Sequence, residues 1–286
     1  MNTKINEKNR KQSNLYVSLE VLTRKWWFYG LIFLTCFIPP WSSYKVQSFS
    51  ELKQLVEYIA EFLIAKKLVL VPYMPYFHLA MLLIFGALFI WKNRFGKAFS
   101  VITGLHFLVI LYMQTGAITD KYGLVFYPNA FIMMFSMALG WIWESFIRKI
   151  DFSFKKIQPR HYLLIAAAVF SFWNPDRAGD YRLILFMTST SPIAFCMITT
   201  IYLALMCVLY PRVNLPLFRI SSYISILIGI VTLGMGFFMD PPARGRYWTL
   251  LHTPMVGVAV YSFVLSLKKI IPQTLPEQPE MSLSNH

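Results

Sequence analysis

Charged residues are scarce in this sequence. Only 14% of its 286 residues are Asp, Glu, Lys or Arg, whereas soluble domains contain about 25%. Acidic residues are the scarcer kind, at 13 against 27 basic residues, so the formal net charge is +14. In a soluble protein this charge would suggest nucleic-acid binding. Here the basic residues lie between long apolar runs, so we expect a lipid bilayer as the partner and no nucleic acid.

The sequence also has few cysteines and lacks the common catalytic motifs. Cys36, Cys196 and Cys207 lie inside apolar runs and form no CxxC or CxxCH pair, which argues against a zinc site, a redox-active disulfide and covalent haem. The patterns GxxxxGK[ST], HExxH and GxSxG are missing. No carboxylate lies deep inside an apolar run, which argues against a carrier coupled to protons or sodium ions through a buried acid.

Apolar residues are abundant, at 57% of the chain, and the mean hydropathy is +0.52. A membrane-spanning helix needs roughly 20 mostly apolar residues. The fifth apolar run is short and the sixth is long, so the boundaries of these two runs are the least defined. We predict an all-α, polytopic membrane helix bundle with about eight transmembrane helices, near residues 26–41, 68–91, 98–115, 124–145, 161–173, 183–210, 220–239 and 248–267.

The distribution of basic residues supports this number of spans. Eight spans place 18 of the 27 Lys and Arg residues on one side, in the two terminal segments and three short loops. Short basic loops favour the cytoplasmic side of a membrane. Tryptophans such as Trp91 and Trp143 end apolar runs, as expected at the headgroup level. We therefore predict a multi-pass protein of the cell membrane with a cytoplasmic N-terminus and a cytoplasmic C-terminus.

The chain divides into three parts. Residues 1–25 form a basic cytoplasmic N-terminal segment, residues 26–270 the transmembrane domain, and residues 271–286 a polar, Pro-rich tail that we expect to be disordered. Within the domain, residues 49–67 have apolar side chains at helical spacing and predict an amphipathic helix on the outer side. This helix is either a connector that hides one apolar face, which we favour, or a lid or partner platform.

The apolar runs pair into four hairpins that share one feature. The returning run of each hairpin has a proline near its outer end, at Pro75, Pro128, Pro192 and Pro254. Proline is well tolerated in the first turn of a helix, where an N–H group has no partner. These prolines mark either a repeated hairpin, with its symmetry axis along the membrane normal, or a coincidence of helix starts.

Three histidines lie within the apolar runs. At a rise of about 1.5 Å per residue, His106 lies near the midplane, whereas His78 and His252 lie in the outer third. His106 is a candidate ligand-binding residue, with Gln114 two turns above it on nearly the same face. His78 and His252 are candidates for a shared metal or haem site. The alternative for each histidine is an interhelical hydrogen bond.

Charged residues of both signs gather in the outer turns beside proline and glycine. They could bind an anionic headgroup or substrate, although ordinary turn chemistry explains the same composition and is the interpretation we favour. The candidate ligand-binding residues in these turns are Arg177, Arg182, Asp240, Arg244 and Arg246.

A polar stretch from Thr188 to Ser191 interrupts the long sixth run just before Pro192. It predicts an unwound helix start that lines a cavity. The alternative is that the span begins near Ser191, because the 20 residues from there to Tyr210 are enough to cross the membrane.

These features favour a carrier or permease-like protein for a small polar or anionic molecule. One alternative is a histidine-liganded haem or metal subunit of a membrane redox complex. Another is a membrane enzyme that acts on a lipid-linked substrate at the outer face, with Asp240, Arg244 and His252 as candidate residues. The sequence identifies no particular cofactor or catalytic residue, and it is compatible with a subunit of a larger membrane complex.

Overall fold

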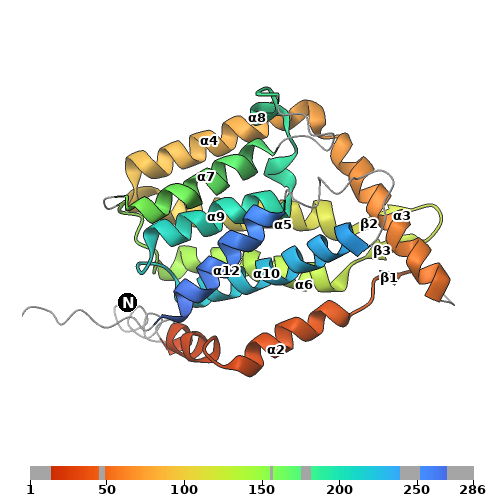
Figure 1. Ribbon diagram of the computed structural model, residues 1–286, viewed down its shortest axis with the longest axis horizontal. Coiled ribbons are helices and arrows are strands. Elements are labelled where there is room, and N and C mark those ends of the chain that lie inside the picture. Colours follow the sequence, from red (N-terminus) through yellow and green to blue (C-terminus); the bar gives the residue numbers. More distant parts are fainter. Residues whose placement is uncertain (1–13, 45–48, 155–156, 175–181, 239–251, 269–286) are drawn as a thin grey trace, which may run out of the picture.

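The computed structural model describes residues 14–44, 49–154, 157–174, 182–238 and 252–268 of the chain. This part of the chain is mostly helical (Figure 1). The expected tail at 271–286 lies outside the described residues. The helices are α2 (Trp26–Leu34), α3 (Phe49–Leu68), α4 (Met74–Trp91), α5 (Asn93–Thr115), α6 (Pro128–Ile147), α7 (Pro159–Trp173), α8 (Leu185–Thr188), α9 (Phe195–Leu209), α10 (Leu215–Phe238) and α12 (Thr253–Leu267).

Four helical stretches in the described part are long and apolar enough to cross a membrane, namely Lys66–Trp91, Asn93–Thr115, Pro128–Ile147 and Leu215–Gly234. A fifth span is reached if the bent pair Leu185–Ile193 and Phe195–Leu209 counts as one. The apolar stretches Trp26–Phe37 and Thr253–Leu267 are shorter. Each of the eight predicted runs contains a helix, but four or five of them meet the length and composition of a span.

The four prolines that marked the hairpins all lie in the first turn of a helix. Pro75, Pro128 and Pro254 begin α4, α6 and α12. Pro192 begins a 3₁₀ turn, Ser191–Ile193, directly before α9. This position suits proline because its missing N–H would have no partner there. The local part of the prediction is confirmed, whereas the fourfold repeat itself is not demonstrated by these helix starts.

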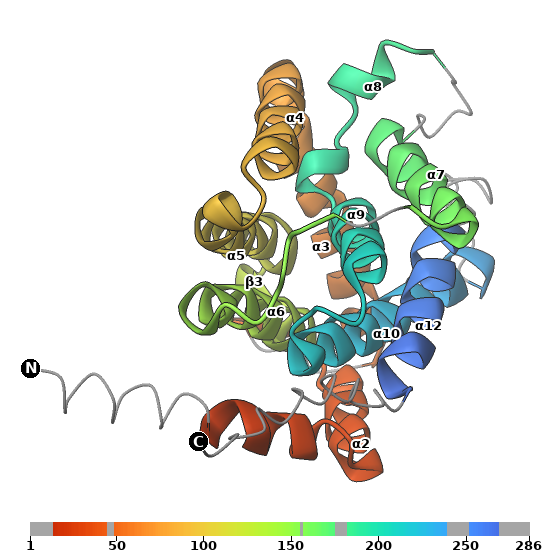
Figure 2. The ribbon, with the colours of Figure 1, turned by 90° about the vertical axis from the view of Figure 1, so that its left-hand side faces the viewer.

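Helix α9 lies in the middle of the bundle, with α5, α7, α10 and α12 around it (Figure 2). Nearly all of its side chains are buried. The outer helix α4 has the opposite distribution, and its side chains Leu83 and Ile90 are 65% and 72% exposed. Apolar surface of this extent on the outside of a bundle is the pattern of a protein embedded in lipid.

Two helices approach each other closely because one of them has a glycine at the contact. Helices α5 and α6 form the most extensive helix–helix interface in the described part. A Cβ atom at Gly104 of α5 would lie 2.6 Å from Cγ1 of Ile142 and 3.0 Å from the carbonyl oxygen of Ala138. Small residues at such crossings allow close backbone packing within a membrane.

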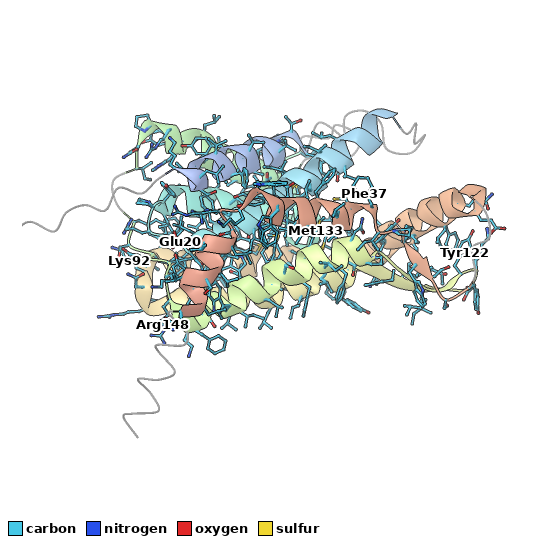
Figure 3. The ribbon with its side chains drawn as sticks, turned by 90° about the horizontal axis from the view of Figure 1, so that it is seen from below. Glu20, Phe37, Lys92, Tyr122, Met133 and Arg148 are labelled. Carbon is cyan, nitrogen blue, oxygen red and sulfur yellow. The ribbon has the colours of Figure 1, made fainter. Side chains whose placement is uncertain are left out.

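The basic segments meet at one end of the bundle. Figure 3 shows Glu20, Lys92 and Arg148 near this end and Tyr122 at the opposite end. The side chain of Asp151 accepts hydrogen bonds from Asn93 (2.7 Å) and from Arg212 (2.6 Å), and so joins three loops. We refer to this end as the basic end.

Arg219 joins the two terminal segments to the same end. It is almost fully buried on α10 and donates to Oγ1 of Thr23 (3.2 Å) and to the carbonyl oxygen of Ser266 (3.2 Å). Buried charged groups need hydrogen-bond partners, and these partners lie in the segment before α2 and in the last turn of α12. The described parts of the five segments that the sequence assigned to one side therefore lie at the basic end.

The opposite end contains a small sheet that the all-α prediction missed. Strands β1 (Trp41–Ser42), β2 (Gly116–Thr119) and β3 (Gly123–Phe126) form an antiparallel sheet in the order β1-β3-β2. Residues 49–67 form a helix as predicted, which is α3. Its Leu55 and Ile59 are completely buried in a cluster that includes Val125 of β3. Helix α3 thus hides an apolar stripe against the sheet, as a connector would.

Candidate functional site at a break before helix α9

The sixth apolar run is broken in its first half. Helix α8 ends at Thr188, and α9 begins at Phe195 after the 3₁₀ turn Ser191–Ile193. The two halves of the run are bent by 93°. Ser189 and Ala194 have extended backbone angles, so the α-helical conformation is interrupted from Ser189 to Ala194 and only the 3₁₀ turn lies inside the interruption. We call residues 189–194 the polar break. The polar stretch in the sequence predicted an interruption of the helix, and the structure shows one. It fits both an unwound helix start and a span that begins near Ser191, and a cavity lined by this stretch stays a prediction.

Unwinding leaves backbone carbonyl groups without helical partners, and buried carbonyls need a donor. Three side chains from neighbouring helices supply one. Nε2 of His78 lies 2.9 Å from the carbonyl oxygen of Ser189. Nε2 of His106 lies 2.5 Å from that of Pro192, and Nε2 of Gln114 lies 2.7 Å from that of Ile193. Three residues selected from the sequence therefore converge on the polar break.

Hydrogen bonding fixes the tautomer of His106. A carbonyl oxygen only accepts, so Nε2 of His106 carries a proton. Its Nδ1 then accepts from the hydroxyl of Tyr202 on α9, at 3.0 Å. The Tyr202 ring contacts the rings of Phe99, Phe107 and Trp141 in the core. The side chain of His106 therefore connects the polar break to the centre of the bundle.

His78 is fully buried and has a different environment. Its ring packs edge-to-face against Phe172 of α7, with 4.6 Å between the ring centroids. Ser191 of the polar break donates to the carbonyl oxygen of Phe172 at 2.6 Å. Within the described part of the chain, Nδ1 of His78 is a buried nitrogen without a hydrogen-bond partner. The end of α7 is thus also tied to the polar break.

His252, the second residue of the predicted metal pair, is the buried residue directly before α12. Helix α4, which carries His78, packs mainly on α5 and α8, whereas α12 packs mainly on α10, α9 and α7. The described residues contain no group of three or more His, Cys, Asp or Glu arranged to hold a metal ion. A metal or haem site shared by His78 and His252 stays a prediction.

The charged outer turns fall largely outside the described residues. Arg177, Asp240, Arg244 and Arg246 all belong to these segments, so their role in binding stays a prediction. Arg182 is described and is exposed just before α8, where its carbonyl oxygen accepts a hydrogen bond from Trp173 at 3.1 Å.

Sequence reasoning missed Tyr202. In the sequence, Tyr202 resembles the other aromatic residues of the apolar runs, and its hydrogen-bond partner His106 is 96 positions away. A detectable signal was present, because Tyr202 carries a hydroxyl at the middle of the most apolar half of the broken run. Such a group needs a partner within the membrane.

The chain matches no model of a known protein family, and no curated protein or solved structure shows detectable similarity to it. Its function is therefore inferred from the chemistry of the polar break and of the bundle around it.

Proposed function

We propose that this chain is a membrane carrier for a small polar or anionic molecule, which binds at the polar break. The observation that carries the proposal is the unwound backbone between α8 and α9, with side chains from α4 and α5 directed at its carbonyl groups. Non-helical backbone at membrane depth is tolerated only where it is buried in protein or lines a cavity. Broken helices of this kind form the substrate sites of many carriers.

The chemistry of the polar break suits a polar ligand. His106 and Gln114 donate to carbonyl oxygens that a substrate donor can also occupy, so binding can exchange one set of hydrogen bonds for another. No side chain of the described residues caps the N-terminus of α9. The positive end of the helix dipole at that point favours a negative group on the substrate. A carboxylate or phosphate combined with a donor group meets both requirements.

The proposal includes eight spans arranged as four hairpins, with both termini in the cytoplasm of a cell. Two observations support this topology. Each of the eight apolar runs contains a helix, and the described basic segments lie together at one end of the bundle. Short basic loops remain on the cytoplasmic side. The polar break then lies between the two membrane faces, as alternating access requires.

The two other functions considered from the sequence have less support. The haem or metal hypothesis rests on His78 and His252, which lie on α4 and directly before α12, two helices that pack mainly on different neighbours. Of the three candidate residues of the enzyme hypothesis, Asp240 and Arg244 lie outside the described residues, and His252 is buried directly before α12. A reducible haem spectrum of the purified protein would nevertheless favour the redox hypothesis over the carrier proposal.

Transport in proteoliposomes tests the proposal. The purified chain is reconstituted and assayed with labelled amino acids, carboxylates, phosphate esters and nucleosides. We expect flux of at least one compound. His106→Ala removes the hydrogen bond to the carbonyl oxygen of Pro192 in the polar break and the hydrogen bond to the hydroxyl of Tyr202 on α9. We expect flux to fall at least about tenfold.

His161→Gln serves as the matched control. This residue caps the start of α7, and glutamine preserves its capping role, so transport should remain at the wild-type rate. Size-exclusion profiles of both variants establish that they are folded. The carrier proposal is abandoned if no compound crosses, or if His106→Ala transports as fast as His161→Gln.

A further inference from the structure

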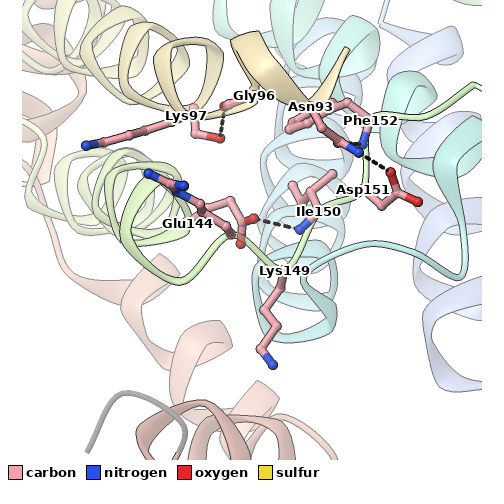
Figure 4. A pocket seen from close by; sticks show the side chains of 10 residues that line it. Asn93, Gly96, Lys97, Glu144, Lys149, Ile150, Asp151 and Phe152 are labelled. Atoms are coloured by element: carbon pink, nitrogen blue, oxygen red, sulfur yellow. Dashed lines mark hydrogen bonds between the residues drawn. The ribbon is translucent and has the colours of Figure 1, made fainter. Parts of the chain in front are cut away.

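A pocket of about 310 Å³ lies at the basic end of the bundle, away from the polar break (Figure 4). It is formed by the first turns of α5, the last turn of α6 and the loop that follows α6. Ligand pockets in proteins occupy roughly 300–1,000 Å³, so this one suits a small group. The charged residues in its lining are Lys97, Glu144, Arg148, Lys149 and Asp151.

The wall of the pocket is built by specific packing. Phe152 lies so close to Gly96 that a Cβ atom there would be 2.7 Å from the ring. The backbone N–H of Phe152 donates to Oδ1 of Asn93 at 2.6 Å. Arg148 ends α6 in the left-handed conformation, with a φ of 50°. These contacts fix the loop after α6 against the start of α5 and keep the pocket open between them.

The two carboxylates of the pocket are already committed to donors of the protein. Glu144 is almost fully buried, and its oxygens accept from the N–H of Ile150 (2.7 Å) and from Nδ2 of Asn214 (2.8 Å). Asp151 forms a salt bridge with Arg212. Neither carboxylate forms an ion pair with a lysine or arginine of the pocket lining in the described part of the chain.

The basic side chains of the pocket, unlike Asp151, form no salt bridge with a described residue. Lys97 and Arg148 are also exposed. Lys149 extends away from Asn93 and Asp151 in Figure 4, and its Nζ lies 4.7 Å from the centre of the Tyr16 ring. The N-terminus of α5 adds partial positive charge to the same pocket, since no described side chain caps it.

We propose that this pocket binds a phosphate group, carried by the headgroup of an anionic lipid, through Lys97 and Arg148. Both side chains can donate charge-assisted hydrogen bonds to phosphate oxygens. Asn93 and Gly96 in the first turn of α5 line the same pocket, and a helix N-terminus favours an anion. The pocket lies at the end of helices with apolar outer faces, where headgroups are found. Basic pockets between transmembrane helices are favourable sites for such headgroups. This site does not depend on the carrier proposal.

Binding to the purified full-length chain tests this site. Dioctanoyl phosphatidylglycerol, dioctanoyl phosphatidylcholine and sodium phosphate are titrated at matched ionic strength, and the apparent Kd is taken from the rise in the thermal unfolding midpoint. We expect saturable binding of phosphatidylglycerol and little response to phosphatidylcholine. The double variant Lys97→Gln/Arg148→Gln should raise the apparent Kd at least about tenfold, because it removes two charged donors.

The control variant Lys92→Gln/Arg94→Gln removes the same charge from the same end without touching the pocket lining, and its Kd should stay close to that of the wild type. If sodium phosphate binds with the same dependence on Lys97 and Arg148, the phosphate site stands and its ligand is a soluble anion. Equal weakening by both double variants, or no binding of any anion, overturns the proposal. If Lys97→Gln/Arg148→Gln does not fold, the apparent Kd values of the single variants Lys97→Gln and Lys92→Gln are compared instead.

Discussion

Asp151 determines how the loops of the basic end are held together. Its oxygens accept hydrogen bonds from Asn93, from Arg212 and from the N–H of Ser153. Partial burial opposes ionisation of Asp151, but these hydrogen bonds outweigh it and hold the pKa of the carboxyl well below its usual range. The carboxylate therefore stays charged throughout the neutral and mildly acidic range and acts as a fixed acceptor.

This lowered pKa predicts how stability depends on pH. The folded state binds its proton more weakly than the unfolded chain does. The contribution of Asp151 is therefore complete above the unfolded pKa of about 3.9 and is lost as the pH falls toward the folded pKa. Thermal unfolding of wild type and Asp151→Asn should differ at pH 7, by less than about 1 kcal/mol for so exposed a pair. The two curves should converge below about pH 4.

Asp120→Asn is the control for this pH profile. Asp120 is exposed on the turn between β2 and β3, at the other end of the molecule, so this substitution removes a carboxylate without touching any partner of Asp151. A difference between wild type and Asp151→Asn that stays constant down to pH 2 contradicts the assignment.

Residues such as His106 and Gln114 were identified from the sequence because a polar group deep in an apolar run needs a partner. The partners themselves were not identified. The carbonyl oxygen of Pro192 is 86 positions from His106, and that of Ile193 is 79 positions from Gln114. Neither spacing follows from helical periodicity, so these contacts depend on the packing of helices that are distant in the sequence.

At the scale of the helices, the interface between α5 and α6 depends on the absence of a side chain at Gly104. We expect Gly104→Ala to destabilise the protein by about 1–3 kcal/mol, because the added methyl group meets the backbone of α6. Reversible unfolding in mixed micelles measures the change.

Gly86 of α4 provides the matched control. No described atom lies within 4 Å of a Cβ atom at this position. Alanine favours a helix over glycine by about 1 kcal/mol, so Gly86→Ala should leave stability unchanged or raise it. If Gly104→Ala is as stable as Gly86→Ala, the close contact between α5 and α6 does not exist in the membrane.

Helices were easier to predict than the other elements. Each apolar run contains a helix because a helix satisfies its own backbone hydrogen bonds, which an apolar environment requires. The strands β2 and β3 are four residues each, too short to produce a clear alternating pattern. The sequence predicted a polar interruption after α8 but not the bend of 93°. The direction of the bend depends on hydrogen-bond donors from α4 and α5, which are distant in the sequence.

At the scale of the whole molecule, charge divides the bundle into two unlike ends, and the proposed orientation can be measured. Arg94→Cys lies at the basic end and Lys121→Cys on the turn between β2 and β3, both at exposed positions. In intact cells, a membrane-impermeant maleimide should label only Lys121→Cys, while Arg94→Cys should react after permeabilisation. The unmodified chain gives the background from its three native cysteines. Labelling of both variants from outside contradicts the orientation.

The burial of α9 has a consequence for how this protein responds to its membrane. Fifteen helical residues rise about 22 Å, less than the hydrocarbon thickness of about 30 Å. A helix this short would create hydrophobic mismatch if lipid surrounded it. Here other helices enclose it, so a thicker or thinner bilayer tilts the outer helix α4 first. Because His78 of α4 is hydrogen-bonded to the carbonyl oxygen of Ser189, a change in bilayer thickness reaches the polar break through α4, even though α9 itself is enclosed.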